Sequence, residues 1–175
     1  AGWCSWYHFY TNVQEKDIRA NLEEARRLQE QLPLSFIQID DGFEARVGDW
    51  LDFSPGFPMG VSPLAQEISS AGFTPGLWLA PFIVDRRSQL AKQQPNWLLR
   101  GRFNLPVNAG FLWNHFATAL DLTIPEALDY ACQVVKTAVN EWNFPYLKLD
   151  FLYAGALPGK RSVIHKTRAQ ILRTS

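Results

Sequence analysis

A lysine and an aspartate interrupt an apolar stretch near the carboxyl end of the chain, in segment 146–151 (YLKLDF). Residues i and i+2 of an extended strand point to the same side, so Lys148 and Asp150 are expected to project together from one face of a buried strand. Such a pair is either a structural ion pair at a strand end or a catalytic carboxylate that a neighbouring cation keeps ionised. Charged residues at the ends of other strands favour the second interpretation.

A second group of charges follows an apolar segment earlier in the chain, where Asp40 and Asp41 precede Gly42. Paired carboxylates can accept hydrogen bonds from neighbouring hydroxyls of a sugar, and a separate carboxylate such as Asp150 can attack the anomeric carbon. The same carboxylates can instead ligate Mg²⁺ in a metal-dependent lyase or isomerase. The spacing of the residues leaves both chemistries open.

Aromatic residues make up 14% of the chain and include seven tryptophans. A flat ring can cover the apolar face of a sugar, and it can equally well fill a hydrophobic core. The composition therefore leaves their role open, and their positions have to decide it.

The hydrophobic pattern predicts strands that alternate with helices. The expected strands cover residues 2–7, 34–42, 74–83 and 146–151, and the expected helices cover residues 16–30, 62–71, 123–142 and 165–173. Ser62 is expected to cap the second helix, and Thr123 and Glu126 are expected to form a capping box for the third. Between residues 84 and 119 the pattern weakens to a long aromatic-rich loop with a short helical patch at 88–93, and loops of this length are typically functional.

This alternation predicts parallel strands joined by right-handed crossovers, as in an open doubly wound sheet or a (β/α)8 barrel. The sequence has no glycine-rich phosphate-binding loop, which disfavours a nucleotide-binding fold. A complete barrel needs about 250 residues and eight strands. The expected fold is therefore α/β, a partial TIM (β/α)8 barrel with about its first four β/α units, and residues 1–175 are expected to form the N-terminal half of a single catalytic domain.

Seventeen basic residues balance seventeen acidic ones, so the chain has no net charge that would attract nucleic acid. Cys4 and Cys132 lack the spacing of metal ligands, and neither a metal nor a cofactor is expected. No apolar run is long enough to span a membrane and no signal peptide opens the chain, so no membrane partner and a cytoplasmic location are expected. The chain begins at Ala1 and ends within a helical pattern, so we expect a piece of a larger protein.

Five segments, in this order, resemble the catalytic barrel of family 36 glycoside hydrolases, the melibiase-type α-galactosidases and their raffinose-synthase relatives. These segments are residues 2–10 (GWCSWYHFY), 37–42 (IQIDDG), 48–50 (GDW), 76–82 (GLWLAPF) and 146–151 (YLKLDF). Each segment alone is a moderate signal, but five in the right order cover almost the whole chain. The resemblance implies retaining hydrolysis of terminal α-galactosides of the melibiose or raffinose type through a covalent galactosyl-enzyme.

The resemblance also implies roles for individual residues. Asp150 is the expected nucleophile, Asp40 and Asp41 are expected to bind galactose hydroxyls, and Lys148 is expected to donate to a ring hydroxyl. Trp50 is expected to help close the sugar subsite.

The resemblance leaves the role of two further tryptophans open. Trp3 and Trp78 belong either to the wall of the pocket or to the packed interior of the barrel. A homo-oligomeric parent protein is compatible with the resemblance.

The sequence departs from the family pattern in two ways. Many members carry acidic residues after the third-strand tryptophan, where this chain has Ala80-Pro81-Phe82. The general acid/base that a retaining enzyme needs is expected from a later strand beyond residue 175, so the isolated chain is expected to be inactive. Transfer of galactose to another sugar and binding of galactosides without catalysis are the alternative functions.

Overall fold

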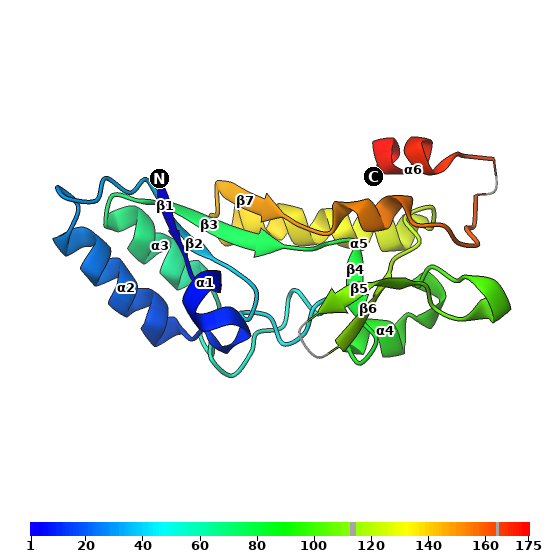
Figure 1. Ribbon diagram of the computed structural model, residues 1–175, viewed down its shortest axis with the longest axis horizontal. Helices are drawn as coiled ribbons and strands as arrows, with labels where there is room; N and C mark the ends of the chain where they lie inside the picture. The colour runs from blue at the N-terminus through cyan, green and yellow to red at the C-terminus, as the bar shows by residue number, and fades with distance from the viewer. Residues whose placement is uncertain (113–114, 164) are drawn as a thin grey trace. The chain divides into compact units, whose positions relative to one another are not determined.

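The computed structural model describes residues 1–112, 115–163 and 165–175, so Trp113 of the predicted loop lies outside the described residues. The chain forms two compact units (Figure 1). Unit 1 contains Ala1–Ala45, Leu51–Leu79 and Val135–Lys148, and unit 2 contains Arg46–Trp50, Ala80–Val134 and Leu149–Ser175.

Unit 1 is built on a sheet whose strands follow the order β1-β2-β3-β7. These strands are β1 (Gly2–Cys4), β2 (Phe36–Ile39), β3 (Thr74–Leu79) and β7 (Tyr146–Leu149). β2 pairs in parallel with both β1 and β3, with Gln38 opposite Cys4 on one side and opposite Gly76 on the other. The α/β class and the parallel pairing of the first three strands are therefore confirmed.

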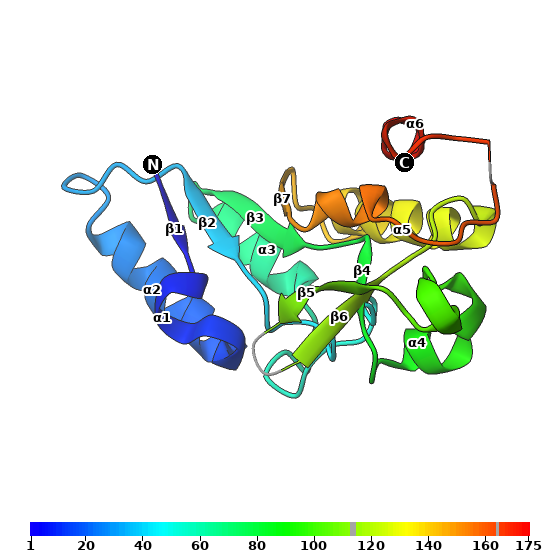
Figure 2. The same cartoon turned by 45° about the vertical axis from the view of Figure 1, so that its right-hand side comes forward.

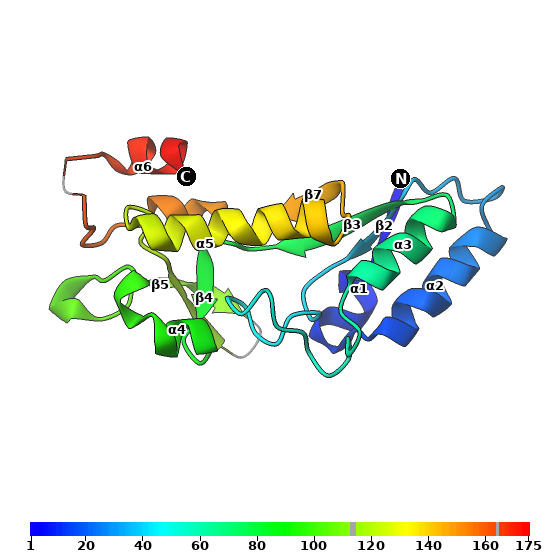
Figure 3. The ribbon, with the colours of Figure 1, turned by 180° about the vertical axis from the view of Figure 1, so that it is seen from behind.

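Two amphipathic helices, α2 (Glu15–Arg27) and α3 (Ser62–Ser70), lie side by side in unit 1 (Figures 1 and 3). Their apolar faces form much of its core together with the strands. The core side chains that these elements bury completely include Ile18, Leu64, Ala65, Ile68, Ile37, Ile39, Leu77 and Leu79. The cap of α3 is Val61, with Ser62 inside the helix, so the prediction of Ser62 as the capping residue is wrong.

The first strand is shorter than predicted because the chain turns after Cys4. The Ser5 N–H donates to the Gln38 carbonyl, and the Ser5 carbonyl then accepts the Phe9 N–H. That second bond closes a helical turn, and the chain continues as α1 (Trp6–Phe9) and the 3₁₀ turn η1 (Tyr10–Asn12). The predicted strand through residue 7 is therefore wrong from Trp6 onward.

The edge strand β7 packs closely on β3 because Gly76 has no side chain. A Cβ atom at Gly76 would lie 2.7 Å from Cδ1 of Tyr146, whose ring also packs on Phe36 with centroids 5.0 Å apart. Among the described residues β7 is the last strand in the sheet order, and Tyr146 and Leu149 are 39% and 41% exposed. The prediction that segment 146–151 is a buried strand is wrong for this reason.

Unit 2 contains an antiparallel sheet in the region that was predicted as a long loop (Figure 2). Its strands are β4 (Ile83–Asp85), β6 (His115–Ala119) and β5 (Asn108–Leu112), in that order. The pairing of β5 shifts between Asn108 and Gly110, which has a φ of 126°. A bulge of this kind breaks the alternation of apolar and polar residues from which strands are predicted, and the loop prediction is therefore wrong.

Five other elements of unit 2 are short. They are α4 (Gln89–Gln93), the 3₁₀ turns η2 (Pro95–Trp97), η3 (Arg102–Asn104) and η5 (Leu152–Ala156), and α6 (Arg168–Thr174). The predicted helical patch at 88–93 is confirmed, with the Ser88 hydroxyl accepting the Ala91 N–H as a cap. Among the described residues, no helix has the length and apolar character needed to cross a bilayer.

Helix α5 (Pro125–Lys136) continues through a π-helical turn, η4 (Thr137–Glu141), close to the predicted end of this helix. The capping box predicted at its start is wrong. The Thr123 hydroxyl donates instead to Asp121, and the helix begins at Pro125.

Candidate active site

Asp40 lies directly after β2 and is almost completely buried in unit 1. Its backbone N–H donates to the hydroxyl of Ser5, 2.9 Å away, at the turn where the chain leaves β1. The parallel pairing of β1 and β2 brings these two strand ends together. The carboxyl ends of two neighbouring strands therefore hold the backbone of Asp40 in place.

Four donors surround the Asp40 carboxylate. Its Oδ2 accepts from Lys148 Nζ at 2.9 Å, from Gln38 Nε2 at 2.7 Å and from Cys4 Sγ at 3.4 Å. Its Oδ1 accepts the Asp41 N–H at 3.0 Å. Three of these contacts fall on Oδ2 and one on Oδ1, so Oδ1 is the less occupied oxygen of the carboxylate.

Burial is the largest cause that raises the pKa of the Cys4 thiol, to about 11, and the negative charge of Asp40 raises it further. The thiol therefore keeps its proton at neutral pH and can donate to Asp40. Cys4 also accepts a hydrogen bond from Gln38 Nε2 at 3.4 Å. Sequence analysis missed both residues, although Gln38 shares the strand face of Asp40 by its i, i+2 spacing.

Asp41 belongs to a second carboxyl pair, with Glu44, beyond the turn at Gly42. Glu44 is 5% exposed and Asp41 7%. Burial, the charge of Asp41 and a side-chain hydrogen bond between the two raise the pKa of Glu44 well above its ordinary value. Glu44 was also missed from the sequence, and its spacing of three residues from Asp41 across a turn glycine was the available signal.

Lys148 supplies the cation of this site from β7. Its side chain is 36% exposed, whereas that of Asp40 is 3% exposed. The structure therefore brings together the predicted residues Asp40, Asp41 and Lys148 at the end of the unit 1 sheet.

Asp150 follows directly on β7 and belongs to unit 2. Its carboxylate Oδ1 accepts the backbone N–H of Phe151 at 2.7 Å. Phe151 has a φ of 53° and a ψ of 24°, in the left-handed region. A bulky side chain rarely adopts this conformation, which costs on the order of 1 kcal/mol, and strained residues cluster at functional sites.

The loop that begins at Asp150 is tied to the antiparallel sheet of unit 2 by Tyr153. Its hydroxyl donates to the Ala109 carbonyl of β5. Burial, followed by the negative charge of Asp150, raises the pKa of Tyr153 above its ordinary value. The phenol thus remains a donor at neutral pH.

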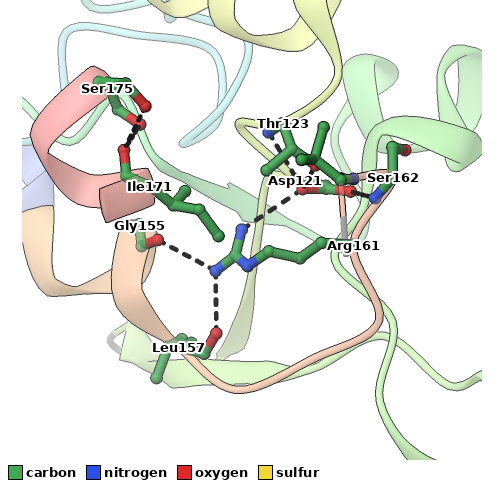
Figure 4. A network of polar contacts seen from close by, with 10 residues as sticks. Asp121, Thr123, Gly155, Leu157, Arg161, Ser162, Ile171 and Ser175 are labelled. Carbon is green, nitrogen blue, oxygen red and sulfur yellow. Dashed lines mark hydrogen bonds and ion pairs between the residues drawn. The ribbon is translucent and has the colours of Figure 1, made fainter. Parts of the chain in front are cut away.

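A buried ion pair holds the far end of the same loop (Figure 4). Arg161 Nη1 lies 3.4 Å from Asp121 Oδ1, and their side chains are 5% and 4% exposed. Arg161 Nη2 also donates to the carbonyls of Gly155 and Leu157, at 3.0 Å and 2.9 Å. One guanidinium therefore joins the end of the Asp150 loop to Asp121, two residues after β6.

Asp121 has further donors from the same region of unit 2. Thr123 donates to Asp121 Oδ1 through its backbone N–H and its hydroxyl, and the Ser162 N–H donates to Oδ2 at 2.9 Å (Figure 4). The buried carboxylate is thus satisfied by neutral donors as well as by the arginine. Sequence analysis identified neither Asp121 nor Arg161, because their pairing depends on a fold that brings residues 40 positions apart into contact.

The three predicted tryptophans lie in different environments. Trp3, on β1, is half-buried and packs edge-on against Phe9 with ring centroids 6.4 Å apart. Trp78 on β3 is 3% exposed, and Trp50 in unit 2 is fully buried. Trp78 and Trp50 are thus as buried as the core side chains. The assignment of the three tryptophans to a sugar subsite stays a prediction.

No metal centre is assigned to this site. Within residues 1–112, 115–163 and 165–175, no group of three or more His, Cys, Asp and Glu side chains is placed to hold a metal ion. The donors around Asp40 include an ammonium and a protonated thiol, which fit a carboxylate that binds a hydroxyl and do not fit one that ligates a cation.

Residues 4–170 match the family model of melibiase, so the chain belongs to the melibiase family. The resemblance stated from the sequence motifs is thereby confirmed. The family contains glycosidases that cleave α-galactosides, as the names of its matched members show.

Two α-galactosidases illustrate the similarity. α-Galactosidase 2 of Pediococcus pentosaceus is 28% identical over 153 residues, which cover 83% of this chain and 20% of that protein. The solved structure of the α-galactosidase from Thermus thermophilus, in complex with p-nitrophenyl α-D-galactopyranoside, is 42% identical with a TM-score of 0.81, and the match covers 90% of this chain and 32% of that one. This chain spans about a fifth of the length of the curated relatives it matches.

A more distant structure supports the fold alone. The family 36 α-galactosidase AgaA from Geobacillus stearothermophilus is 21% identical with a TM-score of 0.71, over 97% of this chain and 24% of that one.

Proposed function

We propose that the protein containing this chain is a retaining α-galactosidase that cleaves terminal α-galactosides through a covalent galactosyl-enzyme on Asp150. The observation that carries the proposal is the 42% identity to the Thermus thermophilus enzyme, whose structures hold p-nitrophenyl α-D-galactopyranoside and stachyose. Oligosaccharides with a terminal α-galactose are accordingly the proposed substrates.

Asp40, Asp41 and Lys148 are the proposed binding groups for galactose hydroxyls. Asp40 Oδ1 accepts the Asp41 N–H, and the Lys148 side chain is partly exposed. The Lys148 ammonium lies 2.9 Å from Asp40 Oδ2, and the Asp40 carboxylate is the proposed acceptor of a hydrogen bond from a sugar hydroxyl. Hydrogen bonds between a sugar hydroxyl and a charged group are stronger than those between two neutral groups.

Asp150 is the proposed nucleophile. In the first step one of its oxygens forms a bond to the anomeric carbon while the glycosidic bond breaks and the leaving oxygen takes a proton from a carboxylic acid. In the second step a water molecule gives that proton back and displaces Asp150. The left-handed backbone at Phe151, which donates its N–H to Asp150, supports a functional position for this carboxylate.

The acid of the first step is proposed to lie outside residues 1–175, on a later strand of the same (β/α)8 barrel, of which residues 1–175 would form the N-terminal half. Retaining enzymes hold their two carboxyl groups about 5 to 5.5 Å apart. At the end of the unit 1 sheet, Asp40, Asp41 and Glu44 are engaged with one another or with Lys148. This engagement suits binding of hydroxyls better than proton delivery to a leaving group.

The test is the hydrolysis of p-nitrophenyl α-D-galactopyranoside by the protein that contains this chain. The Asp150→Ala variant should lose at least about 10³-fold in kcat, because no covalent intermediate forms. A fluorinated galactosyl fluoride should label Asp150 in the wild-type protein, and mass spectrometry of the digested protein locates the adduct. Unchanged hydrolysis by Asp150→Ala would remove this assignment, and oligosaccharide formation in place of galactose release would identify a transferase.

A matched control uses Asp129, an acidic residue on helix α5. Asp129→Ala should leave kcat within about two-fold of the wild type, because surface substitutions away from the site rarely change a protein by more than about 0.5 kcal/mol. A common loss in both variants would point to misfolding and not to the loss of a nucleophile.

A further inference from the structure

We infer that Gln38 is a positioning residue whose side-chain amide holds the Asp40 carboxylate in one orientation for the binding of a sugar hydroxyl. The contact with Asp40 is a property of the fold and needs no reaction. Its effect on sugar binding rests on the proposed α-galactosidase function. Gln38 acts through Asp40 and is not itself expected to touch the substrate.

The contact between Gln38 and Asp40 is short and buried. Gln38 Nε2 lies 2.7 Å from Asp40 Oδ2, and the two residues are 7% and 2% exposed. Lys148 Nζ donates to the same oxygen, so Oδ2 is an acceptor and the amide atom that faces it is the nitrogen. Hydrogen bonds that involve a charged group are roughly twice as strong as those between neutral groups.

The Gln38 amide has an acceptor for each of its two hydrogens. Nε2 donates to Asp40 Oδ2 and also to Cys4 Sγ, which lies 3.4 Å away. A side-chain amide carries two N–H donors on one nitrogen, and rotation of the group would break both contacts. The two acceptors therefore fix the orientation of the amide.

Gln38 is better placed to orient Asp40 than the other two donors to Oδ2. Lys148 has a long, flexible side chain that is 36% exposed. Cys4 offers a weak S–H donor at 3.4 Å. Gln38, in contrast, is a buried residue of β2 that lies two positions before Asp40 in the chain. It holds the carboxylate at Oδ2, and we assign the sugar hydroxyl to the less occupied Oδ1.

The neighbouring strands fix Gln38 before any ligand binds. Gln38 lies opposite Cys4 of β1 and opposite Gly76 of β3, and its carbonyl accepts the Ser5 N–H at 3.2 Å. A Cβ atom at Gly76 would lie 3.3 Å from both Cβ and Cγ of Gln38. The glycine thus leaves the space that the glutamine side chain occupies.

The first test compares the wild type with Gln38→Met in the protein that contains this chain. Methionine has a similar length and no donor, so the KM for p-nitrophenyl α-D-galactopyranoside should rise about 10-fold, the effect of losing one buried hydrogen bond to a charged group. The value of kcat should stay within about three-fold, since Asp40 is proposed to bind the substrate and the transition state alike. Gln66→Met makes the same change at an exposed position of α3 and should leave both values unchanged.

A double-mutant cycle separates positioning of Asp40 from general support of the fold. Asp40→Ala removes the group through which Gln38 acts. Addition of Gln38→Met to Asp40→Ala should therefore lower kcat/KM by less than about two-fold. A general weakening of the fold would instead lower kcat/KM as much in the Asp40→Ala background as in the wild type.

A crystal structure of Gln38→Met tests the positioning without any substrate. The Asp40 carboxylate should occupy a different orientation, or two orientations, because Oδ2 has lost its short contact with the amide. If Gln38→Met does not fold, Gln38→Glu takes its place in every measurement, since an ionised glutamate has the same shape and no donor.

The outcomes separate the inference from the proposed function. An unchanged KM in Gln38→Met, independent effects in the double-mutant cycle, or an unmoved Asp40 carboxylate overturns the inference. If Asp40→Ala does not fold, KM and the crystal structure of Gln38→Met decide. A wild-type protein that cleaves no α-galactoside, together with a displaced Asp40 in Gln38→Met, overturns the proposed function and supports the positioning of Asp40 by Gln38.

Discussion

The ammonium of Lys148 lies 2.9 Å from the Asp40 carboxylate, although β3 separates their strands in the sheet order. The ion pair therefore reaches past β3 and connects the end of β2 with the edge strand β7. Asp40 is buried and Lys148 is partly exposed. Water can solvate the charge of Lys148, whereas the buried charge of Asp40 relies on its partners in the protein.

Replacement of Lys148 by methionine should weaken both stability and substrate binding. The variant leaves Asp40 buried with neutral donors alone, and loss of one partner of a buried pair costs about 3–5 kcal/mol. Because Lys148 is partly exposed, we expect a smaller loss, about 1–3 kcal/mol in the free energy of unfolding by urea. The KM for an aryl α-galactoside should rise in parallel.

The control for this prediction is Arg27→Met, which breaks the exposed ion pair with Glu24. Exposed pairs contribute little to stability. An equal loss of stability in both variants would contradict the special importance of Lys148 for Asp40.

Replacement of Arg161 should loosen the loop that begins at Asp150. Arg161→Lys keeps the charge beside Asp121 but cannot reproduce the fork that reaches the carbonyls of Gly155 and Leu157. Two lost hydrogen bonds correspond to about 1–3 kcal/mol in the free energy of unfolding. Limited proteolysis should cut the loop faster in the variant, and kcat should fall without a matching rise in KM.

Arg86→Lys provides the comparison for Arg161, since Arg86 also donates to a backbone carbonyl but from an exposed position. Its stability and its rate of proteolysis should equal those of the wild type. A loop that is cut equally fast in both variants and in the wild type would show that the Arg161 network does not hold it.

The Cys4 thiol should react slowly with iodoacetamide at neutral pH. Only the thiolate is nucleophilic, and the pKa of Cys4 is raised to about 11 by burial and by the Asp40 charge. In a Cys132→Ala background the rate of alkylation should increase about 10-fold for each pH unit from 7 to 10. Mass spectrometry of the intact protein follows the reaction.

Addition of denaturant supplies the control for Cys4, because unfolding returns the thiol to an ordinary environment and should accelerate alkylation at pH 7 strongly. A rate in the folded protein that already levels off near pH 8 would contradict the raised pKa, and with it the role of the thiol as a donor to Asp40.

Much of unit 1 was predictable because its segments carry local patterns. The faces of α2 and the apolar runs of β2 and β3 follow from spacing along the chain, and these elements form where that spacing places them. Strand β5 of unit 2 was missed because a bulge at Asn108 and Gly110 removes the period of two that identifies a strand. Antiparallel backbone hydrogen bonds hold that sheet together, and the side-chain pattern does not predict them.

The sequence by itself determined which chemical groups stand at the strand ends: Asp40, Asp41, Lys148 and Asp150, together with their family. Spacing along one strand states which side a residue faces, but not which residue of another strand lies opposite. The tertiary structure alone decided that Lys148 bonds to Asp40, with Cys4 and Gln38 as further donors. It also decided that Glu44 is buried against Asp41. Register and burial depend on the whole packed unit, and for this reason no single segment could reveal them.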